Sequence, residues 1–597
     1  MLEVRATPRR WPRALRASVC MGVPVLIGWL TGDLSAGLTA TLGGFTALYG
    51  GGRPYLNRAA LLAVVALSLS AAVGLGIWAA SSTWLGVVTV AAIATAATLL
   101  CNALEVGPPG AYQFALVCAA GTGLYAGHQD PIRSALLVLA GGCFAWLVHM
   151  AGAVFGPRGP EKSAVAAGGF AVADYIGVIA TTGEDAARHR AAQAMHEAWK
   201  NLISRQPRHL PRGATVRRLQ KLTRQLHIIF ADAMSAASSE TLPDPSIATS
   251  ARTLAGQAFD RTGSDAAATA LEQMPLGRPG PWDLIRLSVR PRSRSLLVVI
   301  RVGVATLIAG GLAGLLGLEH AYWAMTAAVL VLHQGLDRRR TTQRALERFV
   351  GTWAGLLLAA AVIATHPHAL WLVTVIMALN FLVELTVVRN YTLSVVFITA
   401  VALVISTGAH GTPDLGSLLL ARGVDTAVGC AVALAVFLLL VPGSVATWLP
   451  TAIADTLDAV GTTAGYLAPV KVTTPEAKAA RRDLQRSVLR LSQMFDNAIN
   501  GSERQRLAAE HSWPAIAATQ RLAYRVVAEC WRLERVPRLS DAETAEMAAQ
   551  FTSAQAAVRA TADAVRAGRN PPPLTIVAGP LADEVHGARD ALVREPT

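Results

Sequence analysis

The chain contains 597 residues, only 15% of them charged, and its mean hydropathy is +0.41. Soluble domains carry about 25% charged residues, so the composition excludes a wholly soluble protein. The net charge of +14 is also compatible with a nucleic-acid partner, but no zinc-ligand spacing, RNP-type string or basic-aromatic stripe accompanies it. We therefore expect the lipid bilayer as partner and no nucleic acid.

Twelve apolar segments form two groups of six, and most are near the length of about 20 residues that a membrane-spanning helix needs. The first group covers about 15–31, 34–50, 59–80, 84–104, 111–126 and 132–155. The second group covers about 295–317, 321–334, 345–364, 369–388, 390–408 and 415–441. Segments 34–50 and 321–334 are short for a full crossing. We predict an all-α membrane protein.

The two groups repeat one another at an offset of 285 to 287 residues. The matching positions are Arg16 and Arg301, Thr41 and Thr326, Arg58 and Arg344, Gly121-Thr122-Gly123 and Ser406-Thr407-Gly408, and Gly142-Cys143 and Gly429-Cys430. Internal duplication of this kind is typical of secondary transporters. Because each group has an even number of spans, we predict two parallel repeats of six transmembrane helices.

A charged, helix-rich tail follows each group. The predicted domains are a first six-helix membrane half (1–155), a helical tail with linker (156–294), a second six-helix membrane half (295–441) and a C-terminal helical tail (442–597). We predict tail helices over 164–205, 214–238, 447–468, 474–500, 503–537 and 540–567, and a loop over 239–282. The tails are expected to form helical hairpins that pack on one another, with a regulatory ligand site as the alternative.

Arginines are concentrated in alternate connections between the spans. These residues are Arg5, Arg9, Arg10, Arg13, Arg53, Arg58, Arg292, Arg294, Arg338, Arg339, Arg340, Arg344, Arg348 and Arg389. With these span limits, the intervening connections contain no Lys or Arg. They contain Asp33, Asp130, Glu319, His320, His366, His368, His410 and Asp414. Since cytoplasmic loops carry the excess of Lys and Arg, we predict a multi-pass protein of the plasma (inner) membrane with both termini and both tails in the cytoplasm.

A series of motifs in the second half resembles the fusaric acid resistance family. The motifs are Tyr322-Trp323, Thr326, Arg344, Arg348, Gly351-Thr352, Gly355, Arg389-Asn390-Tyr391, Phe397, Thr399, Arg422, Asp425, Thr426 and Gly429. The resemblance covers the whole chain in architecture and residues 295–441 in motif detail. It implies export of aromatic or other organic carboxylic acids, because the family includes bacterial exporters of such acids, and plant aluminium-activated malate channels are distantly similar.

The first half departs from these motifs at two places. Gly51-Gly52-Arg53 replaces the arginine-rich loop, and Pro108-Pro109-Gly110-Ala111-Tyr112 stands in the place of Arg389-Asn390-Tyr391.

Two pairs of opposite charges are predicted near the cytoplasmic ends of the spans. Arg301 and Glu384 lie at similar depth in the second half, and Arg16 and Glu105 occupy the matching places in the first. An unpaired ion at that depth is costly, so we predict one ion pair between helices in each half. The pair is either a structural clamp or a gate whose carboxylate takes up a proton.

Arg422 and Asp425 are the strongest candidates for a substrate and proton pathway. They are three residues apart on one helix face, and Asp425 lies near the middle of its span. The first half has Ala135 and Val138 at the corresponding positions. Arg422 can offer a carboxylate a forked donor while Asp425 binds and releases a proton. The alternative is an ion pair whose members satisfy only each other.

Further pathway candidates are Asn380, Asn390, Tyr391 and His333. The two asparagines are equally suited to hydrogen bonds between helices, and His333 to a position at the membrane interface. The arginine cluster 338–348 either draws anions toward the cytoplasmic entrance or serves as a topology signal that contacts lipid headgroups.

The absence of a Gly-x-x-x-x-Gly-Lys-Ser/Thr string argues against an ATP site, and no GxSxG, HExxH or paired-cysteine metal motif is present. We therefore expect no enzyme activity, cofactor or metal. The sequence predicts a proton-coupled secondary transporter for small organic anions. A passive organic-anion channel and a non-transporting membrane scaffold are the alternatives, and homo-oligomerisation stays open.

Overall fold

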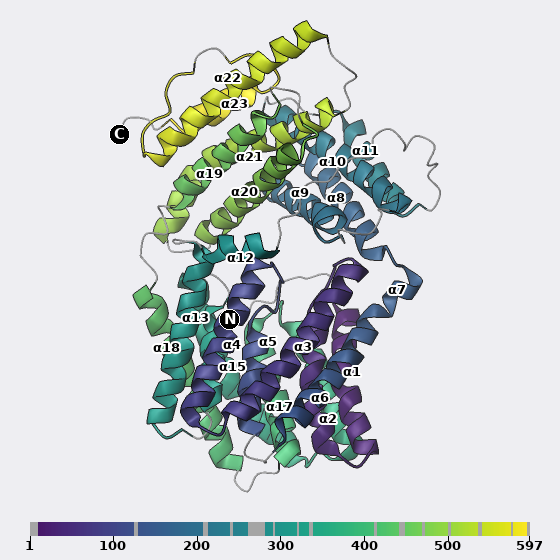
Figure 1. Ribbon diagram of the computed structural model, residues 1–597, viewed down its shortest axis with the longest axis vertical. Coiled ribbons are helices and arrows are strands. Elements are labelled where there is room, and N and C mark those ends of the chain that lie inside the picture. The colour runs from purple at the N-terminus through teal and green to yellow at the C-terminus, as the bar shows by residue number, and fades with distance from the viewer. Residues whose placement is uncertain are drawn as a thin grey trace. The chain divides into compact units, whose positions relative to one another are not determined.

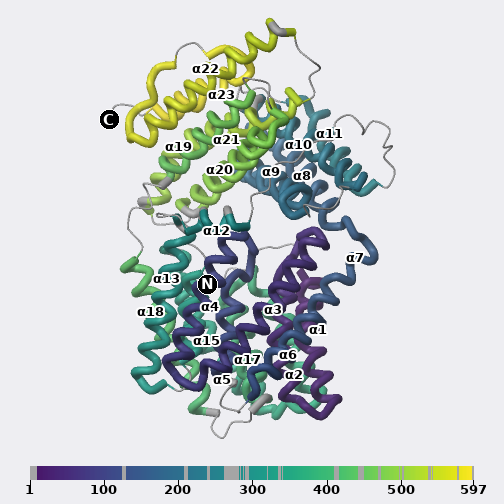
Figure 2. The backbone as a smooth tube through the Cα atoms, in the orientation of Figure 1, coloured from purple at the N-terminus to yellow at the C-terminus, as the bar shows by residue number. Residues whose placement is uncertain are grey.

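The computed structural model describes residues 10–124, 129–206, 213–238, 243–260, 281–289, 293–318, 321–333, 338–410, 415–440, 448–467, 472–499, 503–534, 540–574 and 577–593. Within these ranges every regular element is a helix, which confirms the all-α prediction (Figures 1 and 2). Six of the predicted loop residues, Arg5, Arg9, Arg292, Glu319, His320 and Asp414, lie outside the described residues.

The chain forms two compact units. The apolar-helix unit comprises Met1–Gly51, Arg58–Pro157 and Pro279–Pro442, and the tail unit comprises Gly52–Asn57, Arg158–Arg278 and Gly443–Thr597.

The first half of the apolar-helix unit begins with a helix that contains Pro24 and continues through shorter and longer apolar helices. They are α1 (Trp11–Leu30), α2 (Leu34–Thr41), η1 (Leu42–Leu48), α3 (Tyr55–Ala79), α4 (Thr83–Ala103), α5 (Tyr112–Leu124), α6 (Pro131–Met150) and α7 (Gly152–Phe155). The second half has α12 (Pro281–Val289), α13 (Arg294–Leu315), α14 (Ala321–Leu332), α15 (Arg338–Ala364), α16 (Ala369–Thr386), α17 (Tyr391–His410) and α18 (Leu415–Leu440).

Nine helices among the described residues are long and apolar enough to cross a membrane. They are α1, α3, α4, α6 together with α7, α13, α15, α16, α17 and α18. Segments 34–48 and 321–332 are shorter apolar helices, as predicted. Helix α5 has only 13 residues, so the predicted span 111–126 is also short.

Helices from the two halves of the unit pack against each other. Helix α1 packs against α16, and α13 packs against α4, so the first helix of each half meets the fourth helix of the other (Figures 1 and 2 show α4 beside α13). Within the halves, α6 packs on α2 and α18 packs on α14. Both of these contacts require glycine. A Cβ on Gly141 would lie 2.0 Å from the carbonyl oxygen of Ala40, and one on Gly429 would lie 2.2 Å from that of Ala324.

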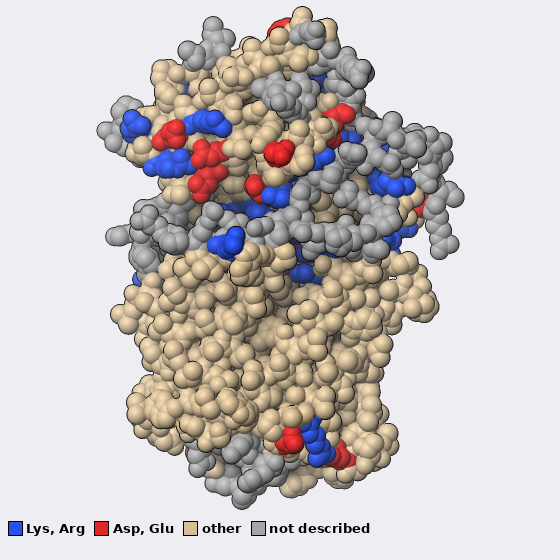
Figure 3. Space-filling model, in the orientation of Figure 1, with Lys and Arg blue, Asp and Glu red and all other residues tan. Residues whose placement is uncertain are grey.

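The outward face of these helices is apolar. Figure 3 shows a broad surface without charged side chains over the apolar-helix unit. Large apolar side chains that are exposed there include Leu67, Trp78, Trp84, Leu136, Leu147, Leu357 and Leu439. A continuous apolar surface of this extent is suited to lipid contact rather than to water.

One arginine corrects the predicted loop charges. Arg133 lies in the first turn of α6, and its Nη2 pairs with Asp33 Oδ2 at 2.6 Å. Arg133 falls inside the predicted span 132–155, so the sequence did not assign it to a loop. Both side chains are well exposed, so the pair is screened by solvent.

The tail unit contains ten helical elements within the described residues, from both tails. They are α8 (Gly159–Ile176), α9 (Glu184–Trp199), η3 (Lys200–Ser204), α10 (Ala214–Ser238), α11 (Pro245–Gln257), α19 (Trp448–Ala464), α20 (Pro475–Ile499), α21 (Glu503–Leu533), α22 (Asp541–Arg566) and α23 (Ala582–Asp590). The predicted helix 164–205 is interrupted after Ile176. The predicted loop 239–282 contains α11, which Asp244 caps by accepting a hydrogen bond from the Ser246 amide at 2.8 Å.

The two tails are joined through α10 and α21. Glu534 lies between the guanidinium groups of Arg224 and Arg481, and its side chain is 6% exposed. The rings of Phe230 and Tyr524 meet edge to face with centroids 5.2 Å apart. The helices of the two tails therefore pack on one another in one helical body.

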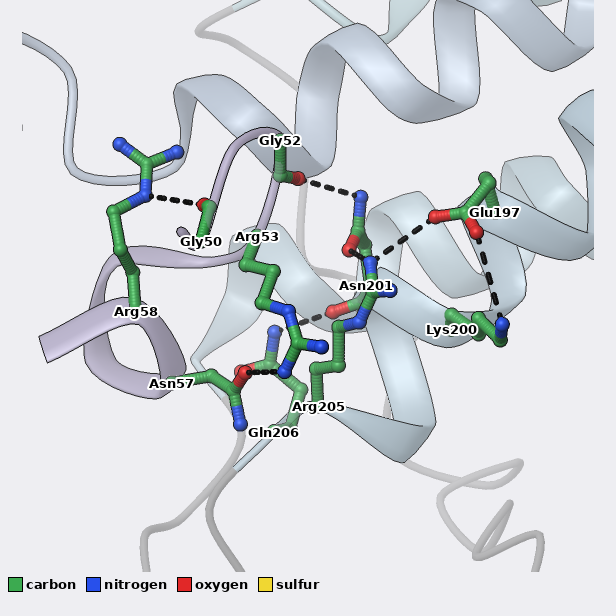
Figure 4. Close-up of polar contacts among 10 residues, drawn as sticks. All are labelled: Gly50, Gly52, Arg53, Asn57, Arg58, Glu197, Lys200, Asn201, Arg205 and Gln206. Carbon is green, nitrogen blue, oxygen red and sulfur yellow. Dashed lines mark hydrogen bonds and ion pairs between the residues drawn. The ribbon is translucent and has the colours of Figure 1, made fainter. Parts of the chain in front are cut away.

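The tail unit includes the connection between η1 and α3 (Figure 4). Asn201 Nδ2 donates to the carbonyl oxygen of Gly52 at 3.1 Å. Arg205 Nη1 donates to Asn201 Oδ1 at 2.8 Å, and Gln206 Nε2 donates to the Asn201 carbonyl oxygen at 2.7 Å, so the asparagine is held in place. Gly52 has a φ of 74°, a conformation that favours glycine. This backbone conformation explains why glycine stands at this position of the loop.

Candidate functional site

Two arginines lie in the interior of the apolar-helix unit. Arg348 is about 15 Å along α15 from its first residue, and Arg422 is about 10 Å along α18. Each side chain is only 1% exposed. Arg422 precedes Gly429 by two turns, and Gly429 abuts Ala324, so this face of α18 is directed toward α14. Both guanidinium groups are therefore far from the helix ends and shielded from solvent.

Aromatic side chains surround the two guanidinium groups. Arg422 Cζ lies 3.2 Å from the centroid of the Trp323 ring, on α14. Arg348 forms a side-chain hydrogen bond with Tyr112, at the start of α5, and its charge is also influenced by Tyr391, at the start of α17. Among the charged side chains, Arg348 has the largest electrostatic effect on Arg422. The two cations therefore belong to one buried cluster.

We call this cluster the two-arginine site. It consists of Arg348, Arg422, Asp425, Tyr112, Tyr322, Trp323 and Tyr391.

The two-arginine site holds donors that the described part of the protein does not satisfy. Nε and Nη1 of both Arg348 and Arg422 are buried without a hydrogen-bond partner among the described residues, as are the Tyr391 hydroxyl and Trp323 Nε1. A buried donor without a hydrogen bond costs about 1–3 kcal/mol, and more if the group is charged. A carboxylate oxygen beside either guanidinium could accept a charge-assisted hydrogen bond from one of these unpartnered N–H groups.

Asp425 is fully buried, and within the described residues neither of its carboxylate oxygens has a hydrogen-bond partner. Arg422 is the cation that acts on it electrostatically. The structure therefore does not show an ion pair in which Arg422 and Asp425 satisfy each other, because N–H groups of Arg422 and both carboxylate oxygens of Asp425 lack hydrogen-bond partners among the described residues.

The structure does not bring together Arg301 and Glu384, which corrects the predicted ion pair. Arg301 Nη2 donates to the carbonyl oxygen of Leu332, and its guanidinium lies over the Phe437 ring with Cζ 5.3 Å from the centroid. Glu384 is influenced instead by two arginines of the first half, Arg10 and Arg13. The physical reason is that Glu384 lies on α16, which packs against α1, whereas α13 packs against α4.

Arg16 and Glu105 are likewise not brought together. The exposed Arg16 side chain donates from Nε to the Pro12 carbonyl oxygen at 3.2 Å. Glu105 follows the end of α4 with a φ of 48° and is also exposed. Helix α1 packs against α16 and α4 packs against α13, so Arg16 and Glu105 do not form an ion pair within the first half.

His333 and the two asparagines occupy different surroundings. His333 is buried, and its ring stacks on that of Tyr112 with centroids 6.3 Å apart, so it adjoins the two-arginine site. Asn390 caps α17 by accepting a hydrogen bond from the Leu393 amide at 3.0 Å. Asn380 is buried on α16, and its Nδ2 has no hydrogen-bond partner among the described residues.

Four members of the site are absent from the predicted pathway residues: Arg348, Tyr112, Tyr322 and Trp323. Arg348 belongs to the arginine cluster 338–348, which predicts a cytoplasmic helix end, although it lies one turn deeper than the half-buried Arg344. Tyr112 lies in the segment that departs from the family motif. Tyr112 and Tyr391 are the first residues of α5 and α17, and both tyrosines act on Arg348.

A curated relative supports the membrane assignment. The chain is 27% identical over 585 residues to an uncharacterised membrane protein, YvaC, of Bacillus subtilis (strain 168), and the alignment covers 93% of this chain and 91% of that protein. No solved structure matches. Together with the apolar helices, this likeness identifies a multi-pass membrane protein.

The family comparison concerns the half that carries both arginines. Residues 308–436, which contain Arg348, Arg422 and Asp425, match the model of the family described as fusaric acid resistance protein-like. This match confirms, for the second membrane half, the family resemblance predicted from its motifs.

Proposed function

We propose that this protein is a secondary transporter that carries aromatic or other organic carboxylic acids out of the cell through the plasma membrane. The observation that supports this proposal best is the set of unpartnered N–H groups on the buried Arg348 and Arg422. Their donors suit a carboxylate, and the neighbouring rings of Trp323 and Tyr391 suit an aromatic or apolar body. The family match in this half agrees with such a cargo.

We further propose that α1–α6 and α13–α18 are two parallel repeats and that the tail unit is cytoplasmic. Corresponding helix pairs support the repeat, since α1 with α16 mirrors α13 with α4. The arginine-rich connections support the cytoplasmic placement.

The driving force has two candidates. In the first, Asp425 binds a proton during the return of the empty site, so that export is coupled to proton entry. The buried and unpartnered carboxylate supports this role. In the second, the anion follows an inside-negative membrane potential, which supplies about 2.3 kcal/mol per charge and 100 mV. The second buried arginine favours this passive pathway, because protonating Asp425 in an empty site leaves two cations uncompensated.

The test uses the full-length protein in proteoliposomes loaded with labelled 4-hydroxybenzoate. Efflux is measured under a potassium diffusion potential without a pH gradient, and under a pH gradient without a potential. We expect Arg422→Gln to abolish efflux under both conditions, because the site loses one forked donor. If Asp425→Asn abolishes only the efflux driven by the pH gradient, the protein is proton-coupled. Efflux in wild type that follows the potential alone identifies the passive pathway.

Efflux by Arg422→Gln at the wild-type rate would refute the proposal. Equal rates in protein-free liposomes would leave the non-transporting scaffold as the function.

A further inference from the structure

The two-arginine site contains an odd number of charges. Arg348 and Arg422 contribute two positive charges and Asp425 one negative charge, and all three side chains are at most 1% exposed. The other titratable groups around them are neutral at physiological pH in their ordinary state. They are Tyr112, Tyr322, Tyr391, His333 and Cys430.

The nearest further cations do not change this sum. Arg344 lies one turn before Arg348 with its Cζ 6.0 Å from the centroid of the Tyr391 ring, but it is only half-buried, so solvent screens its charge, and Glu347 also acts on it. Arg301 is bonded to the Leu332 carbonyl oxygen and stacks on Phe437, which lies about 22 Å beyond Arg422 along α18. The enclosed site therefore carries one net positive charge.

We infer that Arg348, Arg422 and Asp425 together select the charge of the cargo, so that the site takes a monocarboxylate and rejects a dicarboxylate. This inference rests on the proposed transport function and adds the class of substrate. A buried charge is costly unless an opposite charge compensates it, and the cost is large where solvent is excluded. A bound monocarboxylate brings the net charge of the site to zero. A dicarboxylate adds a second negative charge, which stays uncompensated beside Asp425.

Two substitutions alter the sum in opposite directions. Asp425→Asn raises the net charge of the site to two and should favour a dicarboxylate. Arg348→Gln lowers it to zero and should disfavour a dicarboxylate more strongly than a monocarboxylate. Because the two variants shift the preference in opposite senses, a general loss of packing cannot imitate the pattern.

The experiment measures binding of benzoate and isophthalate to the purified full-length protein by calorimetry at about pH 7.5, where both probes are fully ionised. The two probes share one ring and differ by one carboxylate. Asp33→Asn is the matched control, because it removes a carboxylate that pairs with the exposed Arg133. Thermal unfolding of each variant in the absence of probe checks that it is folded.

Wild type and Asp33→Asn should bind benzoate at least about tenfold more tightly than isophthalate, because a like charge beside Asp425 costs several kcal/mol. Asp425→Asn should reverse this preference, and Arg348→Gln should increase it. If wild type binds benzoate and the preference is the same in all variants, the charge inference is wrong while the proposed function stands. If wild type binds neither probe, the proposed function fails and the inference fails with it.

Discussion

Replacing Arg348 with glutamine should weaken carboxylate binding strongly without unfolding the protein. Arg348 has two buried N–H groups, on Nε and Nη1, that lack a partner among the described residues. A hydrogen bond to a charged group contributes about 1.5–3 kcal/mol. The glutamine amide restores one uncharged donor, so we expect a net loss of about 3 kcal/mol, which is about a 100-fold increase in the Kd for benzoate.

The same change should leave the ligand-free protein at least as stable as wild type. Arg348 has the largest electrostatic effect of any charged side chain on Arg422, and the two charges are alike. Removing one therefore relieves repulsion inside the apolar-helix unit. Calorimetric titration gives the Kd, and a thermal scan without benzoate gives the stability.

Arg340→Gln provides the matched control for this prediction. Arg340 lies on the same helix, about two turns before Arg348, and is exposed. Benzoate should bind this variant as it binds wild type. An unchanged Kd in Arg348→Gln, or an equal loss in Arg340→Gln, would refute the assignment of Arg348 to the binding site.

The remaining predictions concern the framework. Glu534→Gln should destabilise the tail unit by about 3–5 kcal/mol in hydrogen-exchange measurements, because it leaves two buried arginines without their shared carboxylate. Burial lowers the pKa of His227 to about 4, so its contribution to stability is complete above about pH 6.5 and is lost as the pH falls toward 4. This loss amounts to up to about 3 kcal/mol, and His227→Gln should remove the pH dependence. Asp33→Asn should change thermal stability by less than about 1 kcal/mol, since its pair with Arg133 is exposed.

The sequence predicted the elements of the apolar-helix unit well because hydropathy and helix length follow directly from the requirements of a bilayer. The short segments 34–50 and 321–334 are short helices in the structure. Helix α11 was missed because its buried face consists of small residues such as Ala251 and Ala255, which give a weak apolar period.

The neighbours of the helices could not be predicted from one sequence. Depth in the membrane placed Arg301 level with Glu384, but depth does not say which helices touch. The exchange of partners between the halves, with α1 against α16 and α13 against α4, is decided by close packing of side chains. This exchange gives Glu384 the arginines of the first half as its charged neighbours.

The candidate site was predicted in part for a similar reason. Arg422 and Asp425 stood out because they are isolated charges in an apolar span. Arg348 did not stand out because four other arginines precede it, and a cluster of that kind normally marks the cytoplasmic end of a helix. Only the packing of α15 against α17 and α18 separates the buried member from the rest.

The most direct test is a distance measurement between a bound carboxylate and the two guanidinium groups. Solid-state NMR on the full-length protein in lipid, with ¹³C-carboxyl benzoate and ¹⁵N-labelled arginine, detects their dipolar coupling. We predict a carbon-to-nitrogen distance of about 4 Å, as expected for a hydrogen-bonded guanidinium and carboxylate. This coupling should disappear in a variant that carries both Arg348→Gln and Arg422→Gln. A coupling of equal size in that double variant would place the carboxylate elsewhere and contradict the assignment of the two-arginine site.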